Sequence, residues 1–374
     1  MIRVLHVIGS MNRGGIETFL MNIYRNIDRN KVQFDFAVHT QKKCAYDDEI
    51  VNLGGRIFYI TPRTKNIFKH NRDWNNLFKN NPEIQIVHQH MASLTYINGL
   101  KFAQKNKVKN CIVHAHNTKS EGKLHYLAHL MNSRKIHKYA TDYFACSSTA
   151  SSWLYGKTKL DPKGAKIINN AIDIQKFTFN DDKRKSIRKE LRLEEGFVIG
   201  HVGRLANQKN HLFLIDVFEK VCDKLENAEL ILVGKGPLEQ SILNYINEKG
   251  LSNKVKFLGN RSDVNDIMQA MDVFVFPSFH EGLGIVLIEA QTCGLECFVS
   301  KEGVPKEAKI TDLLKFISLE DSADEWANNI VKVSHQNTSR HINPCLISDA
   351  GYEIRTEAIS LQEYYLKSLM IKST

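Results

Sequence analysis

Two carboxylates at a fixed spacing form the most specific motif of the chain. Glu281 lies in the glycine-flanked segment 277–290, and Glu289 follows it eight residues later. An apolar run at 273–276 predicts a strand before this segment, and the segment itself predicts a loop that leads into a helix. The first N–H groups of a helix bind anions, and a carboxylate further along it can hold a ribose diol. The alternative is two unrelated surface glutamates. The N–H groups expected to be free are those of Gly284, Ile285 and Val286.

Two cations follow another predicted strand, which ends at Val202. Arg204 and Lys209 lie between this strand and a helix that we expect to begin near Asn210. Cations at the carboxyl end of a strand suit a pyrophosphate leaving group, because they neutralise the charge that develops on the departing oxygen. A solvated loop with two surface cations is the alternative interpretation.

Two glycine-rich loops also follow predicted strands. Residues 9–18 carry Gly14 and Gly15 in a G-x4-G-G spacing, which differs from the G-x-G-x-x-G fingerprint of dinucleotide-binding folds. A phosphate contact near Gly15 and a structural tight turn are equally compatible with this loop. Gly234 and Gly236 precede a proline that suits the first turn of a helix, so this motif is either a ligand loop or a simple strand-to-helix turn.

Four histidines alternate along two predicted strands. His88 and His90 lie near the end of one strand, and His114 and His116 near the end of another. Neighbouring parallel strands could bring the four imidazoles together to bind a metal ion. No carboxylate or thiolate stands at ligand spacing, so packing histidines are the simpler interpretation and no metal site is predicted. His116 stands at the carboxyl end of its strand and is expected to face a ligand.

The elements that must position these residues alternate between short apolar strands and helical segments. Strands are expected at 3–8, 34–39, 56–60, 84–88, 111–114, 143–146 and 166–168, and then at 197–202, 229–233, 255–258, 273–276 and 297–300. Helical patterns lie between them, for example at 17–25, 93–104 and 123–139. This alternation predicts parallel sheets with crossover helices. The expected fold class is α/β with two doubly wound, Rossmann-like domains and a ligand cleft between them, at the carboxyl ends of the strands.

The domain boundaries follow from the same pattern. We expect an N-terminal domain over residues 1–175 and a C-terminal domain over residues 176–351, with the polar stretch 180–192 near the connection. A final helical segment at about 352–371 is expected to pack back on the first domain.

Charge narrows the choice of partners. Residues 1–175 hold 26 Lys and Arg against 12 Asp and Glu, a balance of +14, whereas the remaining residues hold 25 against 29, a balance of −4. A basic first half indicates an anionic partner such as a lipid surface or a phosphorylated acceptor, although it would also serve as a solubilising surface. Nucleic acid is not expected as a partner, because the sequence carries no motif of the common binding modules.

Membrane attachment is expected to be peripheral. No apolar run approaches the ~18–20 residues that span a bilayer, and the N-terminus lacks the layout of a signal peptide. Seven scattered cysteines without a CxxC pair fit a reducing cytosol. Residues 65–79 mix aromatic side chains with cations and could dock on an anionic membrane. The alternative is an amphipathic helix that packs on its own sheet.

Together these motifs resemble the retaining GT-B glycosyltransferases of family 4, in particular bacterial enzymes of capsular or exopolysaccharide assembly. The resemblance covers nearly the whole chain, and its most specific part is the E-x7-E signature at Glu281 and Glu289. The sequence departs from the family at Ala171, where a glycine is common, and the small-residue loop at 303–305 matches loosely.

The resemblance implies a role for each motif residue. Arg204 and Lys209 would bind the donor diphosphate, Glu289 would hold the nucleotide ribose, and His116 would lie beside the reacting sugar carbon. Gly15 would lie near the phosphate, Arg261 would contact the base, and Gly234 and Gly236 would belong to the donor loops. Glu281 and the backbone after it would face the donor sugar and phosphate. That backbone comprises Gly282, Leu283, Gly284, Ile285 and Val286.

We therefore expect an enzyme that moves a hexose from a nucleotide-diphosphate sugar, in the first place a UDP-sugar, to a lipid-linked saccharide acceptor. The resemblance implies retention of anomeric configuration and no metal or other cofactor. Two alternatives stay open at this point: a nucleotide-sugar 2-epimerase of the same fold, and a non-catalytic nucleotide-sugar-binding scaffold.

Overall fold

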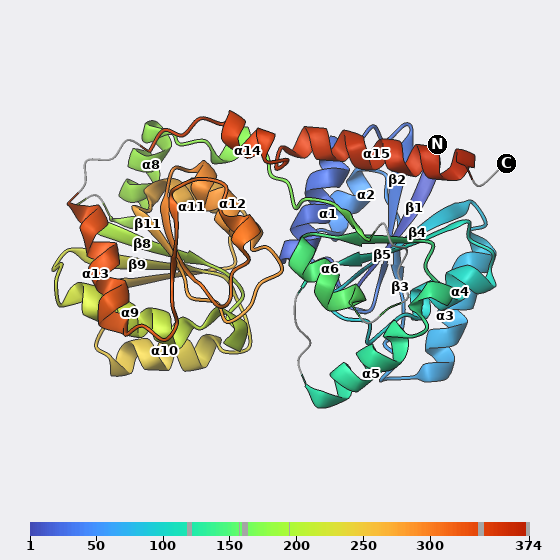
Figure 1. The fold of residues 1–374 in the computed structure, drawn as a ribbon, viewed down its shortest axis with the longest axis horizontal. Helices are drawn as coiled ribbons and strands as arrows, with labels where there is room; N and C mark the ends of the chain where they lie inside the picture. The colour runs from blue at the N-terminus through green and yellow to red at the C-terminus, as the bar shows by residue number, and fades with distance from the viewer. Residues whose placement is uncertain (118–121, 157, 159–163, 194, 336–339, 372–374) are drawn as a thin grey trace. The chain divides into compact units, whose positions relative to one another are not determined.

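The chain divides into two compact units. The computed structural model describes residues 1–371 apart from 118–121, 157, 159–163, 194 and 336–339. The N-terminal unit comprises Met1–Ala171 and Glu353–Thr374, and the C-terminal unit comprises Ile172–Tyr352 (Figure 1). We expected the boundary after residue 175, but Ile172 and Ile174 are buried in the core of the C-terminal unit, so the division falls at Ala171.

The N-terminal unit is built on a seven-stranded sheet in the order β3-β2-β1-β4-β5-β6-β7, and every pair of neighbouring strands is parallel. The strand order changes direction between β1 and β4, which is the point where open α/β sheets bind ligands. The strands are β1 (Ile2–Ile8), β2 (Val32–Val38), β3 (Ile57–Tyr59), β4 (Ile84–Met91), β5 (Asn110–Ala115), β6 (Asp142–Ala145) and β7 (Lys166–Ile167).

The C-terminal unit repeats this plan with a six-stranded parallel sheet in the order β10-β9-β8-β11-β12-β13. Its change of direction falls between β8 and β11. The two Rossmann-like sheets that we expected are therefore confirmed. The edge strand β13 was missed, because it has only four residues and one of them is an exposed lysine. The strands are β8 (Phe197–Val202), β9 (Ala228–Val233), β10 (Val255–Gly259), β11 (Val273–Phe276), β12 (Glu296–Ser300) and β13 (Leu314–Ile317).

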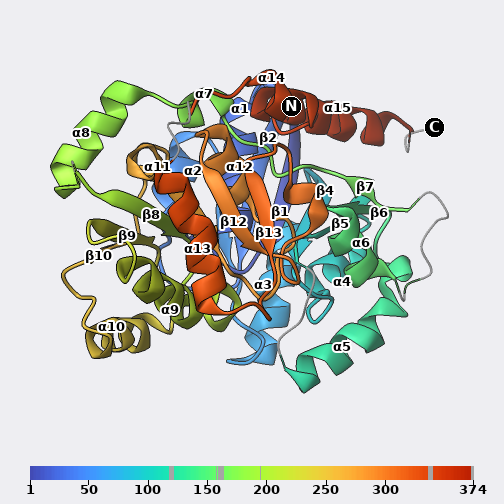
Figure 2. The same cartoon turned by 60° about the vertical axis from the view of Figure 1, so that its left-hand side comes forward.

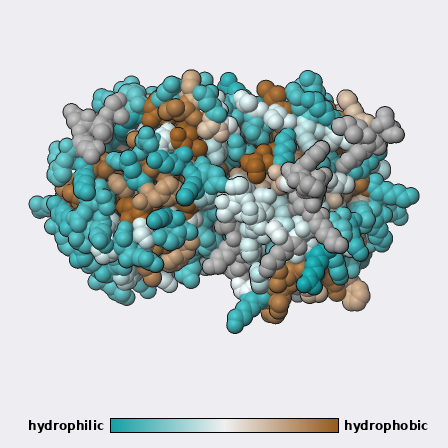
Figure 3. Space-filling view, viewed as in Figure 1, coloured by the Kyte–Doolittle hydropathy of each residue, from teal (hydrophilic) through white to brown (hydrophobic). Residues whose placement is uncertain are grey.

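Helices cover both faces of the N-terminal sheet. One face packs on α1 and on the C-terminal helix α15, whose Tyr365 is fully buried, and the other face packs on α3, α4 and α6. Helix α5 differs, since Leu124, Leu127 and Met131 leave 80%, 55% and 66% of their surfaces exposed; Figure 3 shows apolar side chains gathered over this helix. The helices are α1 (Gly15–Asn26), α2 (Asp47–Asn52), α3 (Ile67–Asn80), α4 (Asn98–Lys105), α5 (Lys123–Ser133), α6 (Ser148–Tyr155) and α15 (Ile354–Ile371).

Helices also cover both faces of the C-terminal sheet. Helices α9, α10 and α13 pack on one face, and Figure 2 shows α13 beside α9; α7, α11, α12 and α14 pack on the other face. Among the described residues, no helix has the length and apolar character that a bilayer crossing requires. The helices are α7 (Ile174–Phe177), α8 (Asp181–Leu191), α9 (His211–Cys222), α10 (Glu239–Glu248), α11 (Val264–Ala270), α12 (Ile285–Thr292), α13 (Ala323–Ser334) and α14 (Cys345–Asp349).

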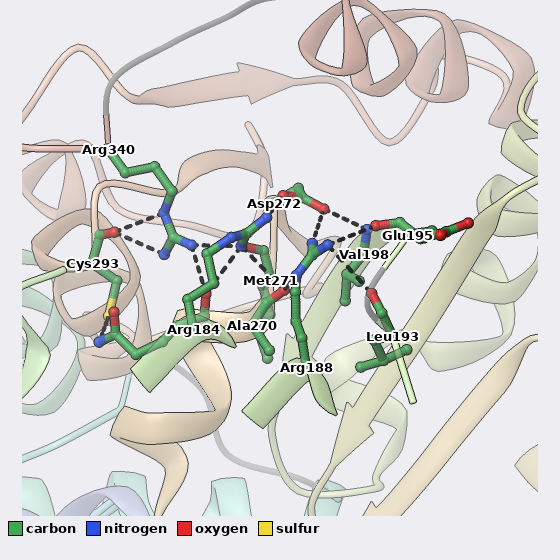
Figure 4. A network of polar contacts seen from close by, with 12 residues as sticks. Arg184, Arg188, Leu193, Glu195, Val198, Ala270, Met271, Asp272, Cys293 and Arg340 are labelled. Carbon is green, nitrogen blue, oxygen red and sulfur yellow. Dashed lines mark hydrogen bonds and ion pairs between the residues drawn. The ribbon is translucent and has the colours of Figure 1, made fainter. Parts of the chain in front are cut away.

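The polar stretch near the expected domain connection is the helix α8. The Asn180 side chain accepts a hydrogen bond from the Lys183 N–H and so caps the helix. Arg184 and Arg188 of α8 both pair with Asp272, which immediately precedes β11, and Arg340 donates to backbone carbonyls beside them (Figure 4). The charges of this stretch therefore fasten a helix to the amino end of the second sheet.

Candidate active site

The cation loop and the carboxylate loop meet at one edge of the C-terminal sheet. Residues 203–210 follow β8 and residues 277–284 follow β11, and these two parallel strands are neighbours. Two hydrogen bonds join the loops: the Phe279 N–H donates to the Gln208 carbonyl oxygen at 2.8 Å, and the Gln208 Nε2 donates to the His280 carbonyl oxygen at 2.7 Å. The motifs at Arg204–Lys209 and Glu281 thus share the site that the strand order favours for ligands.

Lys209 and Glu281 form an ion pair across these loops. The Lys209 Nζ lies 2.7 Å from the Glu281 Oε1, and the two side chains expose only 14% and 7% of their surfaces. The same Nζ lies 4.3 Å from the centre of the Phe276 ring, within the range of a cation–π contact. Glu281 therefore helps to hold the lysine cation in place before any ligand binds.

Arg204 differs from Lys209 in its surroundings. Its side chain is exposed and has no hydrogen bond or ion pair with the part of the chain that the structure describes. An exposed guanidinium presents five N–H donors that match phosphate oxygens. The loop after β8 therefore carries two cations: Lys209, which is paired with Glu281, and Arg204, which is accessible to an anionic ligand.

Gly234 and Gly236 allow the loop after β9 to pack tightly against the cation loop. A Cβ at Gly234 would lie 1.9 Å from the Gly203 carbonyl oxygen, and a Cβ at Gly236 would lie 2.2 Å from the Leu205 carbonyl oxygen. Both distances are far below van der Waals contact, so any side chain at these positions would push the two loops apart. The glycines consequently shape the backbone beside Arg204.

The N-terminus of α12 provides backbone donors at the same edge of the sheet. Gly284 caps the helix with a φ of +78°, a conformation that favours glycine. The N–H groups of Ile285 and Val286 come first in the helix and have no carbonyl partner within it. Gly282 and Leu283 are buried, and Leu283 packs into the core, so the loop that leads into the helix is firmly placed.

Glu289 lies one turn further along α12, and its side chain is almost completely buried. It exposes 8% of its surface, and its carboxylate has no hydrogen bond or ion pair among the described residues. Burial raises the pKa of this carboxyl group from its usual 4.5 to about 7. An unpaired buried carboxylate is costly, so its presence here favours a role in holding a ligand with hydrogen-bond donors, such as a ribose diol.

A third loop, at residues 303–305, supports the carboxylate loop although its sequence matches the family pattern loosely. The Ser300 hydroxyl at the end of β12 donates to the Ser278 carbonyl oxygen. A Cβ at Gly303 would lie 1.8 Å from that same oxygen. The glycine in segment 303–305 was the available signal, because such close backbone approach excludes every other residue.

Arg261 lies after β10 and is already paired. Its guanidinium donates to both carboxylate oxygens of Asp263, at 2.8 and 2.6 Å, and lies 3.6 Å from the Glu190 Oε1. Asp263 therefore fixes the orientation of the guanidinium that would contact the nucleotide base.

Gly15 and His116 belong to the N-terminal unit, at the carboxyl edge of its sheet. Gly15 is the first residue of α1, which follows β1, and His116 comes directly after β5. The His116 N–H donates to the Met91 carbonyl oxygen at 3.1 Å, and Phe19 of α1 lies 5.8 Å from the His116 ring. These contacts place the two motif residues on the ligand-binding edge expected for this sheet.

Five histidines gather beneath this edge: the four that we expected to approach one another, and His6 of β1, which the sequence analysis missed. Two groups of three bring ligand nitrogens within 4.8 Å of one another. The nitrogens of His90 are nevertheless engaged with other imidazoles, at 2.9 Å from His6 and 2.9 Å from His116. The groups are His6, His88 and His90, and then His90, His114 and His116.

Two family models match the chain: "Glycosyltransferase Family 4" over residues 13–176 and "Glycosyl transferases group 1" over residues 182–342. EpsF of Bacillus subtilis (strain 168), assigned to the glycosyltransferases, is 33% identical over 371 residues, which are 97% of this chain and 96% of EpsF. The capsular polysaccharide biosynthesis glycosyltransferase CapH of Staphylococcus aureus is 27% identical over 380 residues, 99% of this chain and 100% of CapH.

Solved structures show the same fold. Anabaena HepE in complex with UDP-glucose has a TM-score of 0.79 at 20% identity, with 98% of this chain and 100% of that chain covered. WaaG, a glycosyltransferase involved in lipopolysaccharide biosynthesis, has a TM-score of 0.71 at 15% identity, with 96% and 94% covered. The relatives favour neither an epimerase nor a scaffold. The chain belongs to the group 1 and family 4 glycosyltransferases, and it is an enzyme with the GT-B architecture.

Proposed function

We propose that this enzyme transfers a hexosyl group from a UDP-sugar to a lipid-linked saccharide during assembly of a cell-surface polysaccharide. The names of two relatives support this proposal. CapH acts in capsular polysaccharide biosynthesis. A galactosyltransferase of Escherichia coli, 28% identical over 299 residues (75% of each chain), uses UDP-Gal and α-D-GlcNAc-diphosphoundecaprenol, as its name states.

The donor assignment rests on one observation. Lys209, Arg204 and Glu289 all come from segments that follow β8 or β11, at one edge of the C-terminal sheet. In the proposal, the two cations bind the diphosphate and stabilise the charge that develops as it leaves. Glu289 accepts hydrogen bonds from the ribose hydroxyls. The N–H groups at the start of α12 and the Glu281 loop contact the phosphate and the donor sugar, and Arg261 contacts the base.

The proposed reaction retains the anomeric configuration of the sugar. The acceptor oxygen would attack from the face that the diphosphate leaves, and the diphosphate would take the acceptor proton. Lys209 already holds Glu281 at 2.7 Å, which suits Glu281 for positioning rather than for attack on the sugar. His116 and Gly15 are proposed as ligand contacts at the carboxyl edge of the N-terminal sheet. Because Arg204 and Lys209 supply positive charge, the proposal includes no metal.

We propose that helix α5 contacts an anionic membrane, where a lipid-linked acceptor would reside. Leu124, Leu127 and Met131 are exposed and recur at the spacing of one helix face. Exposed cations flank this face, and they would attract an anionic lipid surface. The earlier candidate, 65–79, is less suited because α3 buries His70, Trp74, Leu77 and Phe78. The flanking cations are Lys123, Arg134, Lys135 and Lys138.

Sedimentation with vesicles tests the membrane surface. We expect the protein to bind vesicles that contain phosphatidylglycerol and to bind pure phosphatidylcholine vesicles weakly. Leu127→Glu should release it from the anionic vesicles. Ile359→Glu, which changes an equally exposed side chain on α15, should leave binding intact. Equal binding by wild type and Leu127→Glu would contradict the proposed surface.

Incubation of the enzyme with single UDP-sugars and a synthetic diphosphoprenol-linked N-acetylhexosamine, in the presence of EDTA, tests the reaction. We expect a disaccharide with the anomeric configuration of the donor. Conversion of UDP-GlcNAc without acceptor would support the epimerase instead. Inversion of configuration, or transfer only after addition of a divalent metal, would overturn the proposed mechanism.

A further inference from the structure

Three histidines form a hydrogen-bonded chain that leads from the interior of the N-terminal unit to His116. The His6 Nδ1 lies 2.9 Å from the His90 Nε2, and the His90 Nδ1 lies 2.9 Å from the His116 Nε2. Both links join the Nδ1 of one ring to the Nε2 of the next. The chain crosses three neighbouring strands, because β4 lies between β1 and β5.

Packing alone does not account for these imidazoles. His6, His90 and His116 are buried, and burial keeps them neutral: it lowers the pKa of His6 and of His116 to about 3 and lowers that of His90 as well. The outer nitrogens of this histidine chain, His6 Nε2 and His116 Nδ1, have no hydrogen-bond partner within the part of the protein that the structure describes. A buried polar atom without a partner costs about 1–3 kcal/mol, which phenylalanine at the same position would avoid.

The geometry of the chain restricts the tautomers. A neutral imidazole has one N–H and one acceptor nitrogen. Since each link joins Nδ1 to Nε2, all three rings must be Nδ1–H tautomers or all three must be Nε2–H tautomers. The second arrangement buries the His6 Nε2–H among Phe34 and Phe36 without an acceptor. The first arrangement leaves the His116 Nδ1–H instead, and His116 lies at the edge of the sheet where open α/β folds bind ligands. Orphaned buried N–H groups are rare, so a ligand oxygen that accepts from His116 favours the first arrangement.

We propose that His90 and His6 are positioning residues that hold His116 as the neutral Nδ1–H tautomer. In this state the His90 Nδ1–H donates to the His116 Nε2, and the His116 Nδ1–H is left to donate to an oxygen of a bound sugar. This contact and the choice of tautomer rest on the proposed function, whereas the coupling of the three tautomers rests on the hydrogen bonds alone. His116 then acts as a hydrogen-bond donor of constant charge across neutral pH, and no proton leaves the chain.

Nuclear magnetic resonance of the full chain, labelled with ¹⁵N-histidine, tests the tautomer directly. Long-range ¹H–¹⁵N correlations identify the protonated nitrogen, and His116→Gln assigns the His116 signals. We expect a protonated Nδ1 in the wild type and in His90→Asn, because the asparagine amide replaces the Nδ1–H donor. His90→Phe should allow His116 to adopt the Nε2–H tautomer. An Nε2–H His116 in the wild type, or the same tautomer in His90→Phe, would overturn the proposal.

His114→Phe is the matched control. The His114 ring lies 4.0 Å from the His116 ring, centre to centre, but its Nδ1 pairs with His88 rather than with the chain. We expect this variant to keep the His116 tautomer. If His114→Phe and His90→Phe changed the tautomer equally, a general disturbance of the core would explain both, and the proposal would be wrong.

Steady-state kinetics with a UDP-sugar tests whether the His116 tautomer matters for catalysis. His90→Phe should lower kcat by about tenfold or more with little change in the donor KM, because a wrong tautomer impairs an active-site imidazole. His90→Asn should recover most of the rate, and His114→Phe should stay within about twofold of the wild type. Equal losses in both phenylalanine variants would contradict a positioning role. A wild type that shows the Nδ1–H tautomer but turns over no UDP-sugar would refute the proposed function. It would still support the coupling of the three histidine tautomers.

Discussion

The charged groups of Lys209 and Glu281 meet at 2.7 Å although they come from loops that follow different strands. The pair is largely buried and its lysine also rests on the Phe276 ring. A cation that is ordered before binding loses less conformational entropy when an anionic ligand arrives. The relationship thus links the two motifs of the sequence into a single preorganised site.

Removal of one member of this pair should cost stability as well as activity. Lys209→Met keeps the apolar stem on Phe276 but leaves the Glu281 carboxylate without its cation. We expect the free energy of unfolding to fall by about 2–4 kcal/mol, measured by urea denaturation. The double variant Lys209→Met/Glu281→Gln should recover much of that loss and still fail to transfer sugar.

An exposed ion pair provides the control. Lys220 and Asp223 pair at 3.2 Å on the surface, and Lys220→Met should change the free energy of unfolding by less than about 1 kcal/mol. Full transferase activity in a folded Lys209→Met variant would show that Lys209 has no part in sugar transfer.

The raised pKa of Glu289 should couple UDP binding to release of a proton. Ribose hydroxyls that donate to the carboxylate favour its ionised form, so the pKa should fall from about 7 when UDP binds. UDP affinity should therefore rise with pH through neutrality. Calorimetric titration in two buffers of different ionisation enthalpy measures the proton release, which Glu289→Gln should abolish. Unchanged proton release in that variant would disprove the assignment.

The same group should lower the stability of the free enzyme as the pH rises. Between its usual pKa of 4.5 and about 7, the unfolded chain loses the Glu289 proton while the folded chain keeps it, so the free energy of unfolding falls. Glu289→Gln should gain stability relative to the wild type over this range. Burial also raises the pKa of Glu357 on α15 to about 7. Glu357→Gln should thus share the stability effect and leave the proton release on UDP binding unchanged.

Gly234→Ala should disturb the cation loop. Its Cβ would lie 1.9 Å from the Gly203 carbonyl oxygen, so the loop that carries Arg204 must move. Gly250→Ala is the matched control, because Gly250 also has a positive φ but a Cβ there would meet nothing within 4 Å. We expect a loss of about 1–2 kcal/mol for Gly250→Ala with normal UDP affinity. Gly234→Ala should lose more stability and bind UDP more weakly; equal UDP affinity in both variants would show that the loop position is unimportant.

Asp272→Asn should destabilise the C-terminal unit without changing the donor site. The carboxylate pairs with Arg184 and Arg188 and accepts from the Val198 N–H at 2.7 Å, all at the amino end of the sheet. We expect a loss of about 3 kcal/mol in thermal or urea unfolding, because two partly buried guanidinium groups lose their counter-charge. Asp266→Asn, which loses an exposed pair with Lys183, should cost far less. UDP affinity below the unfolding transition should stay normal in both.

The fold was predictable because both sheets rest on strands with continuous apolar runs, such as Phe197–Val202 and Val273–Phe276, whose bounds matched. The short edge strand Leu314–Ile317 lacks such a run. The charged stretch 180–192 gave no apolar periodicity, because α8 is held by arginine contacts to Asp272 and to backbone carbonyls rather than by an apolar face. Contacts of that kind join residues that are far apart in the sequence.

The site was predictable as a set of loops but not as a set of contacts. Strand order alone brings Lys209 and Glu281 to the same edge of one sheet, yet their ion pair depends on side-chain conformations that no spacing specifies. His6 was missed because it stands alone in its strand, without the alternating pattern of His88 and His90. The Arg261–Asp263 pair, in contrast, joins near neighbours in the sequence and could have been foreseen.

Thermal stability in the presence of UDP, GDP, ADP or CMP, each with magnesium and with EDTA, is the measurement that tests the donor site. A ligand at 100 times its dissociation constant adds about 2.7 kcal/mol to the free energy of unfolding. We expect a clear shift of the unfolding temperature with UDP that is the same in EDTA, and no such shift in Lys209→Met. A shift with another nucleotide alone, or with none of the four, would contradict the assignment of this edge of the C-terminal sheet as a UDP-sugar site.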